Sequence, residues 1–144
     1  MSPRETALRT LLVLLEGLPL SFGAVKRNSA VPERVSDQTL VILRDGELGE
    51  PEVTLSPITY HWRHEASVEI FIANAEAVER DARMDGLLVQ LGVVLAANPG
   101  LGGAVDFCAA GVPKFEDLPI EGAAGIKTCV LPLILHYSSA SPLG

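Results

Sequence analysis

The stretch SPITYHWRHEASVEIFIANAEA (residues 56–77) decides the fold, because its second half alternates between two sets of side chains. Apolar residues fill the even positions from 66 to 72, so they would point to one face of a strand, and the odd positions to the other. The alternation ends at Asn74, a residue that favours the start of a helix. We therefore expect a long strand over about residues 59–73, followed by a helix over about 75–97.

That helix is expected to pack on the sheet through an apolar stripe. Gly86 and Gly92 each cost roughly 1 kcal/mol in a helix interior, which close packing against the sheet would offset. The charged residues expected to be solvated are Arg80, Asp81, Arg83 and Asp85. The expected buried stripe consists of Val78, Ala82, Leu87, Leu88, Leu91, Val94 and Leu95.

The chain before this unit predicts a first helix and a first strand. Ser2 and Glu5 are placed for a capping box around Pro3, and leucines at 8, 11, 12 and 15 give a helical apolar face. Residues 21–38 predict a loop with a short strand near 22–25. Residues 39–48 predict a strand that ends in a turn at Asp45-Gly46, and 50–56 an exposed edge segment.

The chain after the second helix predicts a short strand over 104–110, a loop over 111–125 and a last strand over 126–139. Pro132 places this last strand at an edge or on a bulge. The order of elements predicts an α+β fold in one domain spanning residues 1–144. Its expected core is a mainly antiparallel sheet of four to five strands, with two helices packed on one face.

Composition narrows the classes of function. The formal charge is −7 and 48% of residues are hydrophobic, which indicates a globular chain and disfavours a nucleic-acid binder, since that would need lysine and arginine for phosphates. Residues 11–24 are apolar but too short to cross a bilayer, so we read them as helix rather than signal peptide. Cys108 and Cys129 are interpreted as small buried hydrophobic residues.

Four catalytic or metal-binding patterns are weak. His61 and His64 would lie on opposite faces of a strand, so a metal site would need distant ligands such as His136. Cys129 and His136 would also face opposite ways. GLGG at 100–103 follows a helix, whereas a dinucleotide loop precedes one. Two clusters of carboxylates are interpreted as solvated charge: Glu47, Glu50 and Glu52, and Glu116, Asp117 and Glu121.

We therefore expect no enzyme activity, no metal and no cofactor, and a chain that works through its surfaces. A ligand-binding or acyl-handling enzyme domain is the alternative, which would require a deep pocket with a perturbed titratable group.

The order of elements resembles a known family. The strand HEASVEIFIA (64–73) runs into the helix NAEAVERDARMDGLLVQLGVVLAANP (74–99), and IKTCVLPLILHYSS (126–139) ends the fold. With the N-terminal helix, this arrangement is similar to the tail-terminator and tail-completion proteins of long-tailed phages and gene transfer agents. The resemblance covers about residues 4–137.

The resemblance implies a virion protein that forms a ring, usually of six copies, on the head-proximal end of the tail tube. Such a ring ends tube polymerisation, joins the head-completion (stopper) protein, and lets DNA pass through its lumen without specific binding. A head–tail joining protein of the same fold is the alternative. No membrane partner is implied. We expect residues 45–57 and 111–125 to make contacts, with Tyr60 and Trp62 as anchors unless Trp62 packs in the core. The expected interface residues are Tyr60, Trp62, Glu50, Glu52, Phe115, Glu116 and Asp117.

Overall fold

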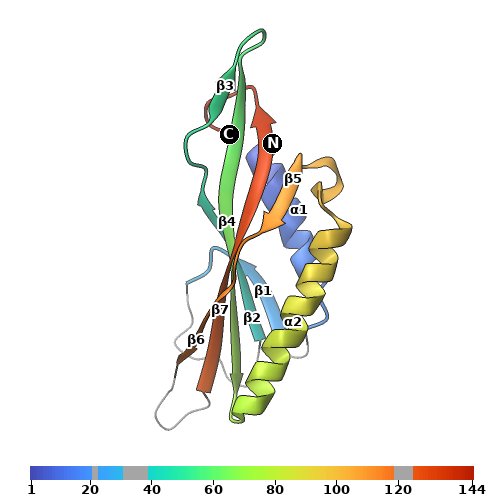
Figure 1. Ribbon diagram of the computed structural model, residues 1–144, viewed down its shortest axis with the longest axis vertical. Coiled ribbons are helices and arrows are strands. Elements are labelled where there is room, and N and C mark those ends of the chain that lie inside the picture. Colours follow the sequence, from blue (N-terminus) through green and yellow to red (C-terminus); the bar gives the residue numbers. More distant parts are fainter. Residues whose placement is uncertain (21–22, 31–38, 119–124) are drawn as a thin grey trace.

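The computed structural model describes residues 1–20, 23–30, 39–118 and 125–144 (Figure 1). The predicted loop over 21–38 therefore lies partly outside the described residues, as does the end of the 111–125 segment. The helices are α1 (Pro3–Glu16), α2 (Ala77–Ala97) and the short 3-10 helix η1 (Leu101–Gly103). The strands are β1 (Gly23–Arg27), β2 (Thr39–Glu47), β3 (Glu52–Thr54), β4 (Thr59–Asn74), β5 (Phe107–Ala110), β6 (Lys114–Leu118) and β7 (Gly125–Ser139).

One sheet of seven strands is built on the long antiparallel pair β4 and β7. These two strands pair from Tyr60–Ser139 at one end to Asn74–Gly125 at the other. The sheet order is β1-β2-β4-β7-β5, with β3 on β4 and β6 on β7, and only β1–β2 is parallel. The predicted α+β class and mainly antiparallel sheet are confirmed, although the described sheet has more strands than the four to five expected.

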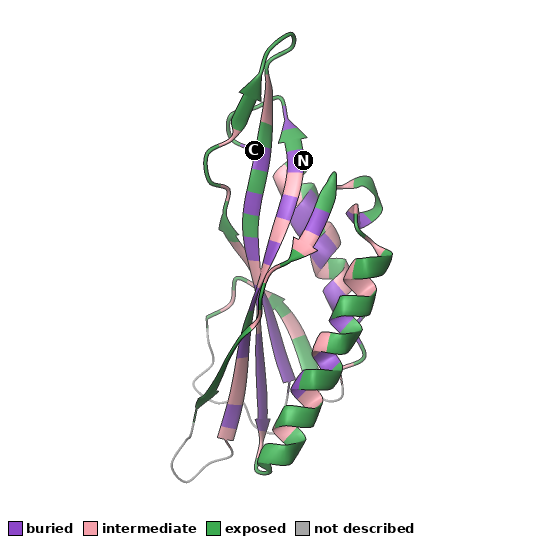
Figure 2. Cartoon of the chain, viewed as in Figure 1, coloured by how far each residue is buried: buried purple, intermediate pink, exposed green. Residues whose placement is uncertain are grey.

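Both helices cover the same face of the sheet (Figure 1). The even-numbered residues of β4 point into this core, and Ala66, Val68 and Ile72 are fully buried. They meet the leucines of α1 and the buried stripe of α2. Figure 2 shows the resulting alternation of buried and exposed residues along β4. The alternation predicted from the sequence is therefore the one that forms the core.

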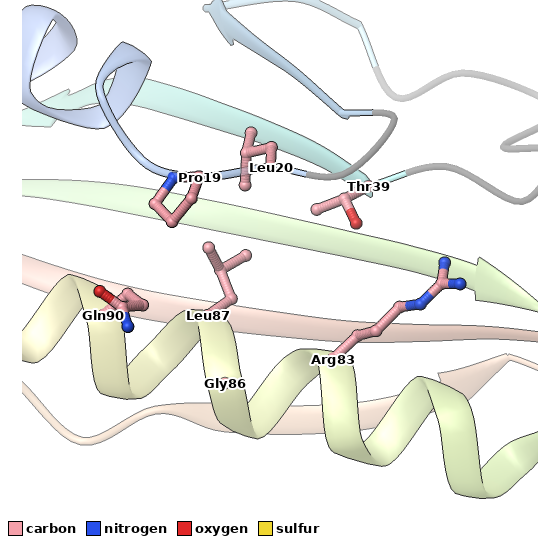
Figure 3. A pocket seen from close by; sticks show the side chains of 7 residues that line it. All are labelled: Pro19, Leu20, Thr39, Arg83, Gly86, Leu87 and Gln90. Atoms are coloured by element: carbon pink, nitrogen blue, oxygen red, sulfur yellow. The ribbon is translucent and has the colours of Figure 1, made fainter.

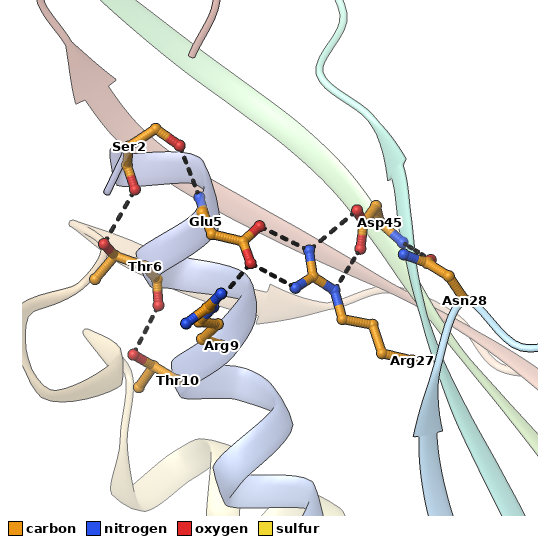
Figure 4. Close-up of polar contacts among 8 residues, drawn as sticks. All are labelled: Ser2, Glu5, Thr6, Arg9, Thr10, Arg27, Asn28 and Asp45. Atoms are coloured by element: carbon orange, nitrogen blue, oxygen red, sulfur yellow. Dashed lines mark hydrogen bonds and ion pairs between the residues drawn. The ribbon is translucent and has the colours of Figure 1, made fainter.

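Helix α1 begins as the sequence predicts but uses its glutamate differently. The Ser2 hydroxyl accepts a hydrogen bond from the Glu5 amide at 3.1 Å, which satisfies one unpaired donor of the first turn. The Glu5 carboxylate does not complete a capping box. It binds the guanidinium of Arg27 in β1 instead, at 2.7 and 2.9 Å (Figure 4).

Arg27 joins three elements, because its guanidinium also donates to Asp45 of β2 at 2.9 and 3.1 Å. Hydrogen bonds from Arg27 and then Arg9 lower the pKa of Glu5 to about 2. Burial alone would raise the pKa of Asp45, but the hydrogen bonds from Arg27 and Asn28 outweigh it and the pKa is lowered. These paired charges hold α1 against the β1–β2 edge of the sheet (Figure 4).

The turn predicted at Asp45-Gly46 is wrong: both residues lie within β2, at a bulge where the register with β4 shifts between Arg44 and Glu47. Gly46 has φ +69° there, and a Cβ on it would lie 1.9 Å from the Glu65 carbonyl oxygen. An Asp-Gly pair serves a bulge as well as a turn, because both need a glycine with positive φ. The close approach of β4 makes the glycine obligatory.

Helix α2 starts at Ala77, two residues later than expected, because Asn74 is the last residue of β4. The Asn74 side chain accepts a hydrogen bond from the Glu76 amide at 2.8 Å, just before the helix. The buried residues of α2 are Met84, Leu87 and Leu91. The predicted stripe residues Leu88, Val94 and Leu95 are partly buried and pack against the same core.

Part of the predicted α2 stripe is wrong. Val78 is 79% exposed, and Ala82 is also exposed. Ala82 lies opposite the buried Met84 because two residues turn a helix by about 200°. Gly86 and Gly92 are exposed, and a Cβ on either would meet nothing within 4 Å. The expected close packing of the two glycines against the sheet is therefore also wrong.

Strand β7 is central rather than an edge strand, which corrects the prediction from Pro132. Its partners on one side are β5, which reaches Leu133, and β6, which starts opposite Val130. Pro132 lies in the gap between them, and its carbonyl accepts from the Gly111 amide at 2.8 Å. In a strand the N and O of one residue point to the same edge, so the missing N–H of Pro132 falls where no ladder bond is needed.

The segment predicted as a loop over 111–125 contains the edge strand β6, which pairs with β7 from Lys114–Val130 to Leu118–Ile126. All five of its residues are exposed. It therefore lacks the alternation of buried and exposed residues by which a half-buried strand is recognised from sequence.

Candidate assembly surfaces

The two histidines of the opening stretch lie on opposite faces of β4, as the strand reading predicts. His61 is exposed and its Nε2 lies 2.8 Å from the Thr54 hydroxyl. His64 is fully buried. Over the residues that the structure describes, no group of three or more histidine, cysteine or carboxylate side chains is arranged to hold a metal ion.

His64 is a core residue with both ring nitrogens satisfied. Its Nε2 bonds the carbonyl oxygen of Asp45 at the bulge, so Nε2 must carry the proton. Its Nδ1 is then the acceptor for the Tyr137 hydroxyl at 2.9 Å. Burial lowers the pKa of His64 and raises the pKa of Tyr137 to about 12. This neutral pair ties the bulge of β2 to β4 and β7.

The cysteines behave as expected for buried hydrophobic residues. Cys108 and Cys129 are both buried as unpaired thiols, and burial raises the pKa of each. Cys129 points into the helix-covered core, whereas His136 lies on the other face and stacks on Phe107 with ring centroids 5.9 Å apart. A Cys129–His136 pair is thus not formed.

Trp62 packs in the core, which is the alternative weighed against an anchoring role. It is only 6% exposed, and its indole N–H donates to the Ser139 hydroxyl at 2.9 Å. Tyr60 is partly buried and stacks on Trp62 with centroids 6.5 Å apart. Little of the Trp62 ring is left for a partner to cover.

A hairpin arm, residues 52–61, projects past the end of α1 (Figure 1). It consists of β3, a turn and the start of β4, with Val53 paired to Tyr60. Its exposed apolar side chains are Val53 at 51%, Leu55 at 75% and Ile58 at 54%. Two carboxylates, Glu50 and Glu52, are exposed beside them. The sequence placed a contact region over 45–57 but did not single out Leu55 or Ile58.

The other predicted contact residues lie on edge strand β6. Phe115 is 52% exposed, and the Lys127 ammonium lies 5.5 Å from its ring centroid. Glu116 and Asp117 are exposed on either face of the strand. The structure thus separates the exposed predicted residues into two groups, one on or next to the arm and one on β6.

A pocket of about 520 Å³ opens between α2 and the segment that follows α1 (Figure 3). Leu87 points from α2 toward Leu20, and the Arg83 guanidinium extends along the side of the pocket that carries Thr39 (Figure 3). We call this the Arg83 pocket. It is lined by Pro19, Leu20, Thr39, Arg83, Gly86, Leu87 and Gln90.

Arg83 is not simply solvated, as its helical position suggested. Its Nη1 atom is buried and has no hydrogen-bond partner among the described residues. Its one ion pair within the described ranges is a long one, 4.0 Å from Nε to Glu79. A guanidinium nitrogen that is buried without an acceptor is costly. The Arg83 side chain as a whole is 36% exposed, so an incoming carboxylate can still reach it from the pocket. No sequence pattern marks it, because its walls come from three separated segments.

A second, shallower hollow of about 400 Å³ lies at the bulge on the other face of the sheet. It brings Glu47 opposite Glu65 in neighbouring strands, with Lys114 at its side. Both carboxylates are exposed, which agrees with the solvated charge expected for the cluster at residues 47–52.

In the part of the chain that the structure describes, neither helix combines enough length and apolar character to cross a bilayer. The chain matches no protein-family model and no curated protein sequence.

Proposed function

We propose that this protein is a structural component of a phage or phage-like particle. It would cap the head-proximal end of the tail tube as a ring and join the tail to the head-completion protein. The proposal combines the family resemblance of the sequence with one observation of the structure, the exposed apolar arm. Monomeric proteins rarely gather exposed apolar side chains on a projecting element unless a partner covers them.

The arm supports assembly because of where its apolar residues stand. Tyr60, which pairs with Val53, lies on the same face of β4 as the buried Trp62 and Ala66, so the apolar stripe of the core runs on past the helices. Beside it, β3 is an edge strand with all three residues exposed. Exposed edges and apolar faces of this kind pair readily with another chain.

The net charge is consistent with the lumen of a ring through which DNA moves. A chain with formal charge −7 repels phosphates on average. A ring lined by it would let DNA slide without holding it.

The test is to purify the protein, measure its mass in solution by light scattering, and image the same sample by negative stain. The proposal expects closed rings of about six subunits, or rings that form when the tail tube protein is added and that stop tube growth. A protein that neither forms rings nor shortens tubes would refute it. Binding to the head-completion protein without any effect on tube length would instead indicate the joining protein.

A further inference from the structure

The Arg83 pocket and the arm are complementary in chemistry. The pocket offers apolar walls at Leu20 and Leu87, and the cationic side chain of Arg83, which is 36% exposed and lies a long 4.0 Å from Glu79. The arm offers exposed apolar side chains at Leu55 and Ile58 with the Glu52 carboxylate on the adjoining strand. Each surface supplies what the other lacks, an acceptor for the guanidinium and a cover for apolar side chains.

One chain cannot satisfy both surfaces by itself. Thr39 of the pocket pairs with Ile72 near the far end of β4, whereas Ile58 precedes the first residue of that strand. Fourteen residues of strand separate the two levels, which is roughly 45 Å at about 3.3 Å per residue. The arm and the pocket lie toward opposite ends of the molecule (Figure 1), so an arm that fills a pocket must come from another copy.

We propose that the arm of one copy docks in the Arg83 pocket of the next. Leu55 and Ile58 pack against Leu20 and Leu87, and the Glu52 carboxylate accepts hydrogen bonds from Arg83. The contact joins two different surfaces, so it is heterologous and propagates around a ring or along a filament. This inference rests on the proposed function, in which copies form a ring, and assigns the contact that closes it.

Disulfide trapping tests the geometry directly. A Leu55→Cys chain mixed with a Gln90→Cys chain should give a crosslinked heterodimer under mild oxidation, because Gln90 lines the pocket. The native thiols of Cys108 and Cys129 are buried and do not compete. The matched control replaces Gln90→Cys with Val93→Cys, on an exposed residue of α2 outside the pocket. Crosslinking to position 90 and not to 93 is expected; equal crosslinking, or none at millimolar protein, overturns the proposal.

A charge exchange tests the ion pair. Arg83→Glu and Glu52→Arg should each weaken self-association at least tenfold in sedimentation velocity, while thermal unfolding of the subunit stays cooperative. The double variant should recover most of the loss, since the pair is restored in the opposite sense. An Asp106→Arg variant is the control for net charge, because Asp106 is exposed and lies outside both the arm and the pocket. Loss without recovery in the double variant overturns the assignment of Glu52 to Arg83.

The outcomes separate this contact from the proposed function. Rings that cap tubes but show no crosslink between 55 and 90 would refute the contact and leave the function standing. A crosslink in a protein that never caps tubes would retain the contact and refute the function. Octanoate is the probe for a small-ligand site. If octanoate binds the wild type but not Arg83→Gln, and no crosslink between 55 and 90 forms, then the pocket binds a free carboxylate and the proposal is wrong.

Discussion

Substituting Gly46 and Gly49 separates backbone strain from a direct clash. Both glycines have φ +69°, so alanine at either site costs about 1–2 kcal/mol for a left-handed backbone. At Gly49 the nearest atom to an added Cβ is 4.0 Å away. At Gly46 the added Cβ would lie 1.9 Å from the Glu65 carbonyl oxygen, and real Cβ contacts essentially never fall below 3.0 Å. Strands β2 and β4 must therefore move apart by about 1 Å for alanine to fit at position 46.

That movement adds a cost like overpacking, about 1–3 kcal/mol, and it strains the bond from His64 to the Asp45 carbonyl. We expect Gly46→Ala to lower the free energy of unfolding by about 2–5 kcal/mol and Gly49→Ala by about 1–2 kcal/mol. With a urea dependence of about 2 kcal/mol per molar, the midpoints fall by roughly 1–2.5 M and 0.5–1 M. Urea unfolding followed by tryptophan fluorescence measures both. Equal midpoints for the two variants would refute the clash, and with it the bulge.

Three further predictions concern charge and helix propensity. Because Arg27 lowers the pKa of Glu5 to about 2, the Glu5 carboxylate stabilises the fold above pH 4.5. This contribution, about 1 kcal/mol for a partly exposed pair, is lost as the pH falls toward 2. The urea midpoint of Glu5→Gln, measured against pH, should lack that step. Burial lowers the pKa of His64, so the unfolded state takes up the proton first and the free energy of unfolding falls as the pH drops below 6.5. A His64→Gln variant whose free energy of unfolding declines as much between pH 7 and 5.5 would contradict this. Gly86→Ala and Gly92→Ala should each raise the free energy of unfolding by about 0.5–1 kcal/mol, which corresponds to a Tm increase of roughly 2–4 °C. A lower Tm at either site would mean that the added methyl group is not in open space.

The long strands were predictable because their signal is local. The strand predicted over Thr59–Ala73, from the alternation in its second half, is β4, which spans Thr59–Asn74, and the strand predicted over 126–139 is β7, which begins one residue earlier. A period of two needs no knowledge of the neighbours. The α+β class followed from the order of these segments, and is confirmed.

The bulge and the partner strands were not predictable in the same way. Asp45-Gly46 suits a turn or a bulge equally, and the choice is made by Glu65, nineteen positions after Gly46 in the chain. Edge strand β6 is exposed at every residue, so it has no pattern of its own and forms only because β7 offers it hydrogen-bonding groups. Pro132 was misread for the same reason, since the gap that accommodates it lies between two other strands.

Arg83 was misread because the rotation of a helix about its axis is set by packing. Helix α2 begins at Ala77 and buries Met84. This rotation decides which neighbours the charged residues of its first turns meet. Arg80 then bonds the Asn74 carbonyl at 2.6 Å, and Arg83 reaches the pocket. A stripe counted from Val78 gives the wrong rotation. The candidate site on α2 therefore required the structure.

For Trp62, the pattern of the sequence itself favours core packing over the anchoring role weighed against it. Carrying the even-numbered stripe of β4 back from Ala66 places Trp62 and Tyr60 on the core face, which favours packing over anchoring. Exposure along this stripe rises from buried Trp62 at 6% to Ile58 at 54%, although the residues are similarly apolar. The difference is coverage, because the helices lie over one end and not the other (Figure 2). The hydrophobic effect that buries Trp62 under the helices acts on Leu55 and Ile58 as well, but none of the described elements of this chain covers them.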